Sequence, residues 1–237
     1  FHFGTTSEGC SLTENLELTI NHNCGGSNTI WPEGTVHCSG TPTEVVEVTN
    51  PTTGKTWMDR NLGASRAATS STDEEAYGDL YQWGRFSDGH QCRNSNTTST
   101  LSSTDQPGHG DFITVNSEQY DWRSPQNDNL WQGVNGINNP CPSGYRLPTV
   151  LEWEEERLSW SSINSTGAIT STLKLPGAGF RSYRGGGSLS LVGMLGNYWT
   201  SSSVYPQKNR LSIGSANAPM DYQQRNWGFS VRCIKDY

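Results

Sequence analysis

The chain has 237 residues, of which 16 are Lys or Arg and 23 are Asp or Glu, for a formal net charge of −7. This charge disfavours non-specific binding to nucleic acid and to anionic membranes. No apolar run approaches the roughly 20 residues of a membrane span, and the chain starts at Phe1 without a Met or a signal peptide. We therefore expect a processed, exported protein.

Cysteine usage agrees with export. The six cysteines are even in number and widely spaced, and none forms a Cys-x-x-Cys pair. This pattern favours three disulfides in an oxidising compartment, and it leaves the pairing open. The cysteines are Cys10, Cys24, Cys38, Cys92, Cys141 and Cys233.

The first 42 residues differ from the rest of the chain. They hold three of the cysteines and a short alternating run, "LELTI" at residues 16–20. We predict a disulfide-stapled strand-and-loop segment over residues 1–42. After it, "EVVEVTN" and "WMDRN" indicate two strands around the turn "PTTGKT", where Gly54 suits a hairpin.

Two helices are predicted in the middle of the chain. The stretch "STDEEAYGDLYQWGR" has N-cap candidates and an apolar stripe, which predicts an amphipathic helix over residues 71–85. A second helix is expected after "CPSGYRLPT", where Thr149 and Glu152 have the spacing of a capping box. Between them, residues 86–139 are polar and without a sustained period, which predicts a long ordered loop held by aromatic side chains.

Strand-like runs separated by glycines follow the second helix. The last of them, "WGFSVRCIKD", alternates Phe229, Val231 and Cys233 as expected for a half-buried strand. Helices in the first part and strands in the second part predict an α+β domain over residues 43–237.

Several motifs in this domain resemble a known family. The stretches "TGKTWMDRNLGAS", "AYGDLYQWGR", "DGHQ", "CPSGYRLPT", "LKLPGAGFR", "GNYWTSSS" and "WGFSVRCIKD" are similar, in the same order, to the Fibrobacter succinogenes major paralogous domain. That family has a C-type lectin-like fold, which it shares with formylglycine-generating enzymes and with the variable proteins of diversity-generating retroelements. The resemblance covers roughly residues 45–236.

The resemblance implies a C-type lectin-like domain with small antiparallel sheets, two helices and long ordered loops. It also implies that Cys141 pairs with Cys233, which leaves Cys10, Cys24, Cys38 and Cys92 to pair among themselves. For these four we expect Cys10 to pair with Cys24, and Cys38 with Cys92.

Four stretches could suggest catalysis, and we predict a scaffold role for each. Asp59 and Arg60 are expected to satisfy each other or buried backbone groups, because partly buried charges need partners. "DGHQC" holds Asp88, His90 and Cys92, but neighbours in sequence do not easily converge. The four glutamates between residues 152 and 156 should spread around a helix as a solvated face, and "YRGGGS" should form a turn. We predict no catalytic residue.

A metal site is considered in the long loop. The stretch "YDWRSPQNDNLW" contains Asp121 and Asp128, whose carboxylates are the ligand type that calcium prefers. The spacing of an EF-hand is missing. We therefore expect no cofactor except a possible structural calcium.

The predicted binding face lies near the C-terminus. Residues 197–227 are rich in Tyr, Trp, Arg and Asn, which are common in binding surfaces, and the resemblance implies that this region carries the variable positions of the retroelement proteins. The predicted ligand-binding residues are Tyr198, Ser202, Tyr205, Asn209, Arg210, Asn217, Asp221, Tyr222, Asn226 and Trp227.

These observations lead to one functional prediction and two alternatives. We predict a secreted or surface-exposed binding protein, an adhesin or receptor-binding module, which recognises a protein or glycan on a cell surface. The first alternative is a structural subunit of a filament or coat that self-assembles through residues 1–42. The second is an enzyme of the formylglycine-generating type, which needs two reduced, reactive cysteines.

Overall fold

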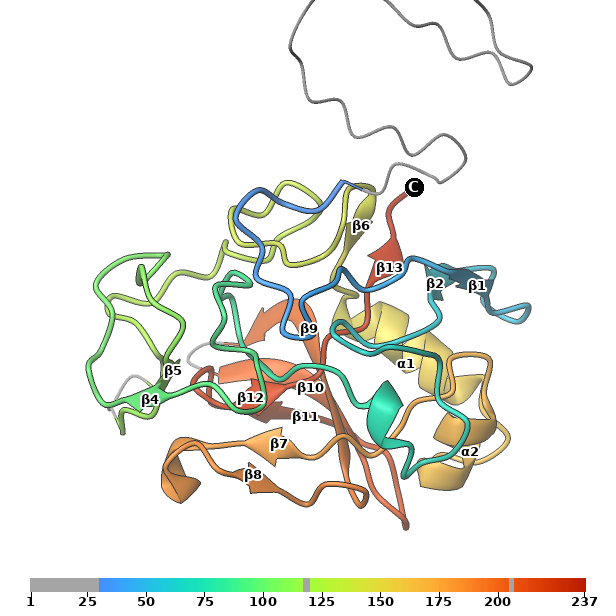
Figure 1. Ribbon diagram of the computed structural model, residues 1–237. Coiled ribbons are helices and arrows are strands. Elements are labelled where there is room, and N and C mark those ends of the chain that lie inside the picture. Colours follow the sequence, from blue (N-terminus) through green and yellow to red (C-terminus); the bar gives the residue numbers. More distant parts are fainter. Residues whose placement is uncertain (1–29, 117–119, 205–206) are drawn as a thin grey trace, which may run out of the picture.

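The computed structural model describes residues 30–116, 120–204 and 207–237, without the side chains of residues 204, 207 and 208 (Figure 1). The predicted strand at residues 16–20 and the predicted Cys10–Cys24 disulfide lie outside these ranges. Within them, no helix is long and apolar enough to cross a membrane.

Most of the strands form three small antiparallel sheets. The first sheet has the order β1-β2-β13-β6, the second β11-β10-β9 and the third β3-β12-β7-β8. The strands of the first sheet are β1 (Glu47–Thr49), β2 (Thr56–Met58), β13 (Ile234–Lys235) and β6 (Tyr145–Arg146). Those of the second are β11 (Met220–Gln223), β10 (Gln207–Ile213) and β9 (Gly196–Val204). Those of the third are β3 (Tyr81–Gln82), β12 (Gly228–Phe229), β7 (Phe180–Arg181) and β8 (Leu189–Ser190). With two α-helices, these sheets confirm the predicted α+β class.

The second sheet separates two hydrophobic clusters. Trp199 of β9 belongs to a cluster with Phe229, whereas Tyr198 belongs to another with Leu211 and Trp153. Adjacent residues of a strand point to opposite faces, so β9 is covered on both sides. Strand β9 therefore lies between the two clusters.

The predicted hairpin and the second predicted helix are both present. β1 pairs with β2, and Gly54 takes the turn with a φ of 70°. Helix α1 (Val150–Leu158) begins at the capping box: Glu152 N donates to Thr149 Oγ1 at 3.2 Å, and Thr149 N donates to Glu152 Oε2 at 2.7 Å. A short helix that we did not predict, α2 (Ser165–Thr170), follows it.

The helix predicted over residues 71–85 is wrong. Only a 3-10 turn, η1 (Glu74–Ala76), forms before the chain turns at Gly78, which has a φ of 65°. A Cβ at Gly78 would lie 2.3 Å from the carbonyl oxygen of Leu62. The backbone is therefore held in a left-handed conformation against Leu62, and it continues as β3 rather than as helix.

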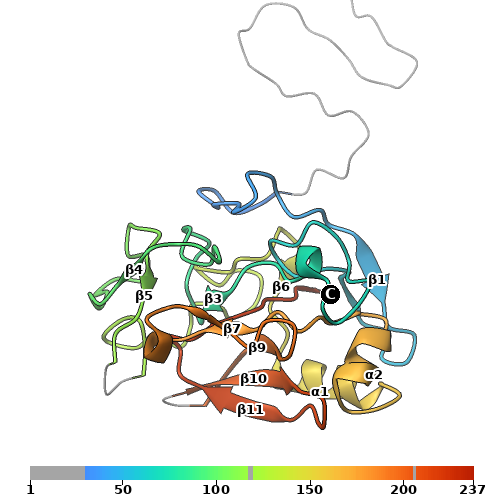
Figure 2. The ribbon, with the colours of Figure 1, turned by 60° about the horizontal axis from the view of Figure 1, so that its bottom comes forward.

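The long segment 86–139 is pinned to the domain as predicted. Phe112, Trp122, Leu130 and Trp131 are buried, whereas Tyr120 is exposed. The segment contains the parallel pair β4 (Thr97–Thr98) and β5 (Phe112–Ile113). Figures 1 and 2 both place this pair at the opposite end of the molecule from α1 and α2.

Two of the expected disulfides are present, Cys141–Cys233 and Cys38–Cys92. They indicate an oxidising environment. Residues 30–42, which the sequence assigns to the N-terminal segment, are tied to the domain: Val36 N donates to Ser87 O at 2.7 Å, and Cys38 is bonded to Cys92.

The final stretch is more buried than predicted. Phe229, Val231 and Cys233 are buried, but so are Ser230 and Arg232 on the other face. Arg232 donates to Asn61 Oδ1 at 2.9 Å and to backbone carbonyl oxygens, including that of Leu173 at 2.8 Å. The prediction of a half-buried strand was therefore wrong, because hydrogen bonds allow an arginine inside the core.

Candidate binding face

Two of the ten predicted ligand-binding residues are buried, which contradicts a surface role. The Tyr198 side chain is 0% exposed, and its hydroxyl donates to Pro176 O at 3.0 Å. Asn226 is also buried, and its amide donates to Val115 O at 2.7 Å. Both side chains satisfy backbone groups inside the fold, so neither can contact a ligand on the surface.

Strand register divides another four of them between two faces. Arg210 pairs with Asp221 across β10 and β11, and Asn209 pairs with Tyr222. Because side chains alternate along a strand, Arg210 and Asp221 point to one face of the sheet and Asn209 and Tyr222 to the other. A compact ligand cannot contact both pairs.

The remaining four predicted residues are placed separately. Ser202 is half-buried, and its hydroxyl accepts a hydrogen bond from Val150 N at 3.0 Å in the first turn of α1. Asn217 is exposed in the turn between β10 and β11, and Tyr205 lies outside the described residues. Trp227 is half-buried and packs against Phe180 and Phe229.

Arg210 is the best-connected residue of the predicted set. Its guanidinium contacts Asn197 Oδ1, and it donates to Asp221 Oδ2 at 3.2 Å. The side chain of Arg210 is 12% exposed, whereas that of Asp221 is 46% exposed. Burial lowers the pKa of Arg210, and Asp221 opposes that shift. The arrangement presents a desolvated positive charge whose protein partner is accessible to solvent.

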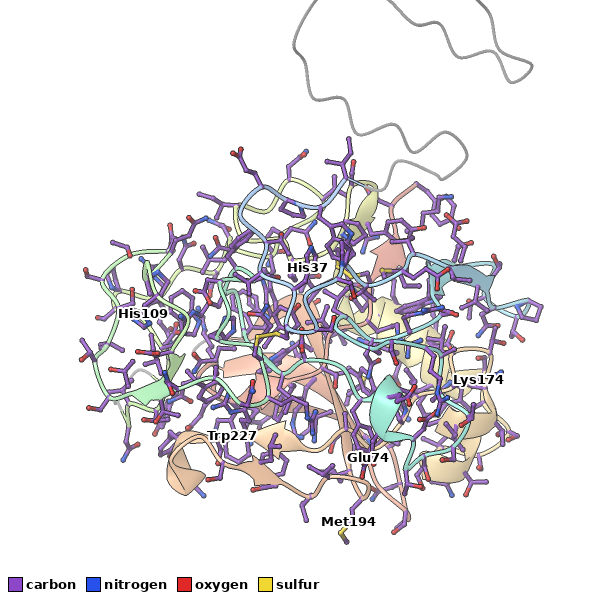
Figure 3. The ribbon with its side chains drawn as sticks, viewed as in Figure 1. His37, Glu74, His109, Lys174, Met194 and Trp227 are labelled. Carbon is purple, nitrogen blue, oxygen red and sulfur yellow. A yellow bond between two sulfur atoms is a disulfide. The ribbon has the colours of Figure 1, made fainter. Side chains whose placement is uncertain are left out.

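Aromatic rings lie beside Arg210. Its guanidinium is 5.0 Å from the centroid of the Phe229 ring. Phe229 contacts both Trp227 and Phe180, which stack on each other with centroids 5.1 Å apart. Figure 3 labels Trp227 beside β7, the strand that carries Phe180. Phe180 and Trp227 are both partly exposed, and both pack on the buried Phe229 ring that the guanidinium contacts.

We call this surface the Arg210 face and define it by Arg210, Asp221, Asn197, Phe180 and Trp227. It contains three buried donors that have no acceptor among the described residues: Arg210 Nε, Asn197 Nδ2 and Trp227 Nε1. The Asn197 side chain is fully buried, so a ligand at the surface can contact only Arg210, Asp221, Phe180 and Trp227. Sequence reasoning missed Phe180 and Asn197, because only strand pairing brings them here.

The Asp88–His90–Cys92 stretch forms a structural cluster. Contrary to our expectation, Asp88 and His90 do converge, since Asp88 Oδ1 lies 2.7 Å from His90 Nδ1. His90 Nε2 accepts from Gln82 N at 3.0 Å, and burial lowers the pKa of His90 to about 4. Cys92 is in a disulfide. This histidine is therefore committed to the backbone of β3.

The other candidate stretches also have structural contacts. Arg60 Nε donates to Asp59 Oδ1 at 2.7 Å and Arg60 Nη1 to Ser65 O at 3.0 Å, as expected for scaffold. The glutamates are not all solvated, which corrects our prediction. Glu156 is buried, accepts from Asn50 Nδ2 at 2.7 Å and has a pKa raised by burial. The glycine-rich stretch forms a turn at η2 (Tyr183–Gly185) as predicted.

The two carboxylates predicted as calcium ligands share an arginine. Asp121 Oδ2 lies 3.3 Å from Arg225 Nη1, and Asp128 contacts the same guanidinium. Burial raises the pKa of Asp121 to about 6. No group of three or more His, Cys, Asp or Glu side chains in the described part of the chain is arranged to hold a metal ion. Arg225 thus supplies positive charge to both carboxylates, and calcium at this place stays a prediction.

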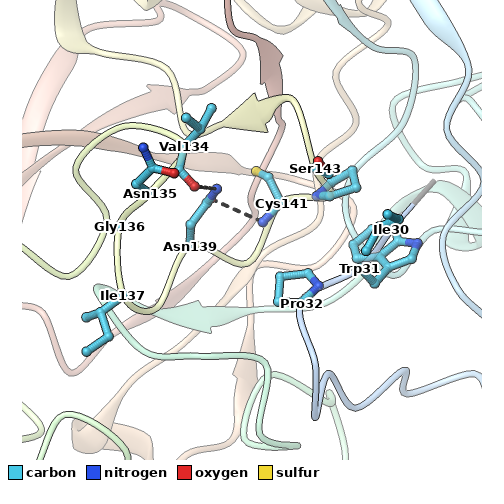
Figure 4. A pocket seen from close by; sticks show the side chains of 11 residues that line it. Ile30, Trp31, Pro32, Val134, Asn135, Gly136, Ile137, Asn139, Cys141 and Ser143 are labelled. Carbon is cyan, nitrogen blue, oxygen red and sulfur yellow. Dashed lines mark hydrogen bonds between the residues drawn. The ribbon is translucent and has the colours of Figure 1, made fainter.

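A groove of about 410 Å³ lies elsewhere, between residues 30–32 and the loop 134–143 (Figure 4). Ile30 and Ile137 on its lining are 66% and 63% exposed. Asn139 holds the loop in shape, since its amide donates to Val134 O at 3.2 Å. None of the described residues that line the groove titrates, because Cys141 is in a disulfide.

The chain matches no known family profile, no curated protein and no solved structure. Membership of the C-type lectin-like group therefore stays a prediction from the motifs.

Proposed function

We propose that this protein is a secreted or surface-exposed binding protein, an adhesin or receptor-binding module, and that the Arg210 face holds its ligand. The observation that carries the proposal is the largely buried Arg210 guanidinium paired with the half-exposed Asp221 carboxylate, with a partly exposed aromatic pair that packs on the same Phe229 ring. Aromatic and arginine side chains dominate the energy of binding surfaces, because they give large contact areas with directed hydrogen bonds. The two disulfides support an extracellular location.

A binding role fits the chemistry of the described residues better than catalysis does. Cys38, Cys92, Cys141 and Cys233 are oxidised, so a reactive thiol pair would have to come from Cys10 and Cys24. Quantifying free thiols in the denatured protein tests this: zero thiols argues against chemistry of the formylglycine-generating type.

The binding proposal is tested on an array of glycans and cell-surface proteins, probed with the purified protein. Arg210→Ala should lose the ligands that the unmodified protein retains. Tyr222→Ala is the matched control, because Tyr222 is exposed on the opposite face of the same sheet. Ligands that depend on Tyr222 and not on Arg210 would move the site to the other face.

The groove between residues 30–32 and 134–143 supports a second candidate, a structural subunit of a filament or coat. Ile30, the first described residue, and Ile137 are exposed on its lining, and apolar grooves accept segments of neighbouring chains. Sedimentation at increasing protein concentration distinguishes the candidates, since a subunit should form assemblies that keep growing and an adhesin should not.

A further inference from the structure

We propose that residues 189–194 form a contact through which two copies of this chain associate. This surface is separate from the Arg210 face, and the proposal does not depend on the ligand bound there. Four features support it: the exposed side chains of the segment, the way its backbone is held, the pocket beside it, and its lack of charge.

Four large aliphatic side chains are exposed within these six residues. Leu189, Leu191, Val192 and Met194 are 42%, 46%, 39% and 69% exposed. Figure 3 shows Met194 projecting from the lower end of the molecule. One exposed aliphatic side chain needs no explanation, but a group of them on one segment is typical of a surface that contacts another molecule. We call these four side chains the aliphatic patch.

The backbone holds the patch in a fixed shape. Met194 N donates to Leu191 O at 3.1 Å, which closes a tight turn, and Gly193 N donates to Gly177 O at 2.7 Å. Leu191 has a φ of 51°, a left-handed conformation that is strained in a leucine. The fold maintains this conformation although it leaves the Leu191 side chain in solvent. The turn therefore presents a preorganised apolar surface.

A pocket of about 260 Å³ opens beside Met194. This volume is below the range of about 300 to 1,000 Å³ that is typical of sites for drug-sized ligands, so the pocket suits a single side chain. Met194 itself lines the pocket, together with Ser71, Ser165, Leu175, Pro176, Gly177, Gly193, Gly196, Ile213 and Ser215. A projecting side chain and a cavity of side-chain size thus lie next to each other on one surface.

A second copy of the chain matches this arrangement. In a two-fold dimer the same surface meets itself, so a projection on each copy has to enter a cavity on the other. Met194 and the pocket beside it meet this requirement, and the flexible methionine side chain adapts to irregular cavities.

The charge of the surface favours the same partner. Residues 185–198 include no Asp, Glu, Lys, Arg or His, and none of the described residues that line the pocket is charged. Each copy has a net charge of −7. Contact through the aliphatic patch therefore brings two copies together without placing like charges against each other.

The test measures the mass of the full chain by sedimentation at increasing protein concentration. We expect the mass to rise from the 26.1 kDa of one chain toward twice that value. Met194→Asp places a charge in the contact and should weaken dimerisation by about tenfold or more. Leu151→Asp is the matched control, because Leu151 is 72% exposed in the first turn of α1 and does not line the pocket, so the dimer should be unchanged.

Ser215→Trp tests the pocket separately. Ser215 is exposed and lines the pocket, so a large ring there should block the cavity and weaken dimerisation while Met194 stays in place. Near-UV circular dichroism checks that each variant is folded.

Three results would overturn the proposal. One is a mass that stays at 26.1 kDa at every concentration, which is also expected if a molecule other than a second copy covers the patch. Another is a dimer that persists in both Met194→Asp and Ser215→Trp. The last is association that is lost only in Ile137→Asp or that grows beyond two copies, which would assign it to the groove between residues 30–32 and 134–143 or to an open assembly.

Discussion

The Cys141–Cys233 disulfide offers the sharpest test of the fold. It joins residues 92 positions apart, from the loop before β6 to the residue that precedes β13. In the chain-entropy description, closing a loop of that length destabilises the unfolded chain by about 4.6 kcal/mol, against about 4.2 kcal/mol for the 54-residue separation of Cys38 and Cys92. Both sulfurs of the longer loop also lie in the hydrophobic cluster with Trp131.

Two double variants are compared. One carries Cys141→Ala and Cys233→Ala, and the other carries Cys38→Ala and Cys92→Ala. Urea unfolding under oxidising conditions should show losses of about 4 to 5 kcal/mol for each pair, with the larger loss for the buried one. Peptide mapping without reduction checks the bonds themselves. A loss below about 1 kcal/mol for the first pair, or a peptide joining Cys141 to another cysteine, would refute the reasoning.

Three further predictions concern buried charges. Arg60→Ala should lower the free energy of unfolding by about 1 to 3 kcal/mol, because it leaves Ser65 O without its donor, and binding by the folded variant should be unchanged. Burial raises the pKa of Asp79 to about 7 from 3.8, so the folded state holds a proton that the unfolded state releases, and stability falls as pH rises from about 4 to 7. Asp79→Asn should flatten that dependence in urea titrations, with a gain on the order of 4 kcal/mol at pH 8, and an unchanged pH profile contradicts the assignment. Glu156→Ala should cost at least about 1 kcal/mol, whereas Glu155→Ala, exposed on the same helix, should cost almost nothing in thermal melts.

Local signals predicted the elements that depend on local interactions. The capping box at Thr149 and the turn at Gly54 need only residues a few positions away, and both are present. The prediction of a helix over residues 71–85 was wrong because the backbone at Gly78 is set by a contact with the carbonyl oxygen of Leu62, which is distant in sequence. An apolar stripe in the sequence carries no information about that contact.

The candidate site was likewise predictable only where local sequence decides it. Composition indicated the region of Arg210 and Trp227, since polar and aromatic residues concentrate there. Which of them share a face depends on strand register, and register placed Tyr198 in the core and Tyr222 on the far side of the sheet. Phe180 comes from a strand 47 residues before Trp227 in the chain, so no local pattern could have joined the two.

The central claim is that the Arg210 face binds the ligand, and one comparison tests it most directly. The dissociation constant for the first ligand retained on the array is measured for the unmodified protein, Arg210→Ala and Tyr222→Ala, after near-UV circular dichroism has shown that all three are folded. We predict that Arg210→Ala weakens binding by about 1 to 3 kcal/mol, or roughly 5- to 150-fold, and that Tyr222→Ala stays within about twofold. An unchanged constant for Arg210→Ala, or a loss confined to Tyr222→Ala, would contradict the account.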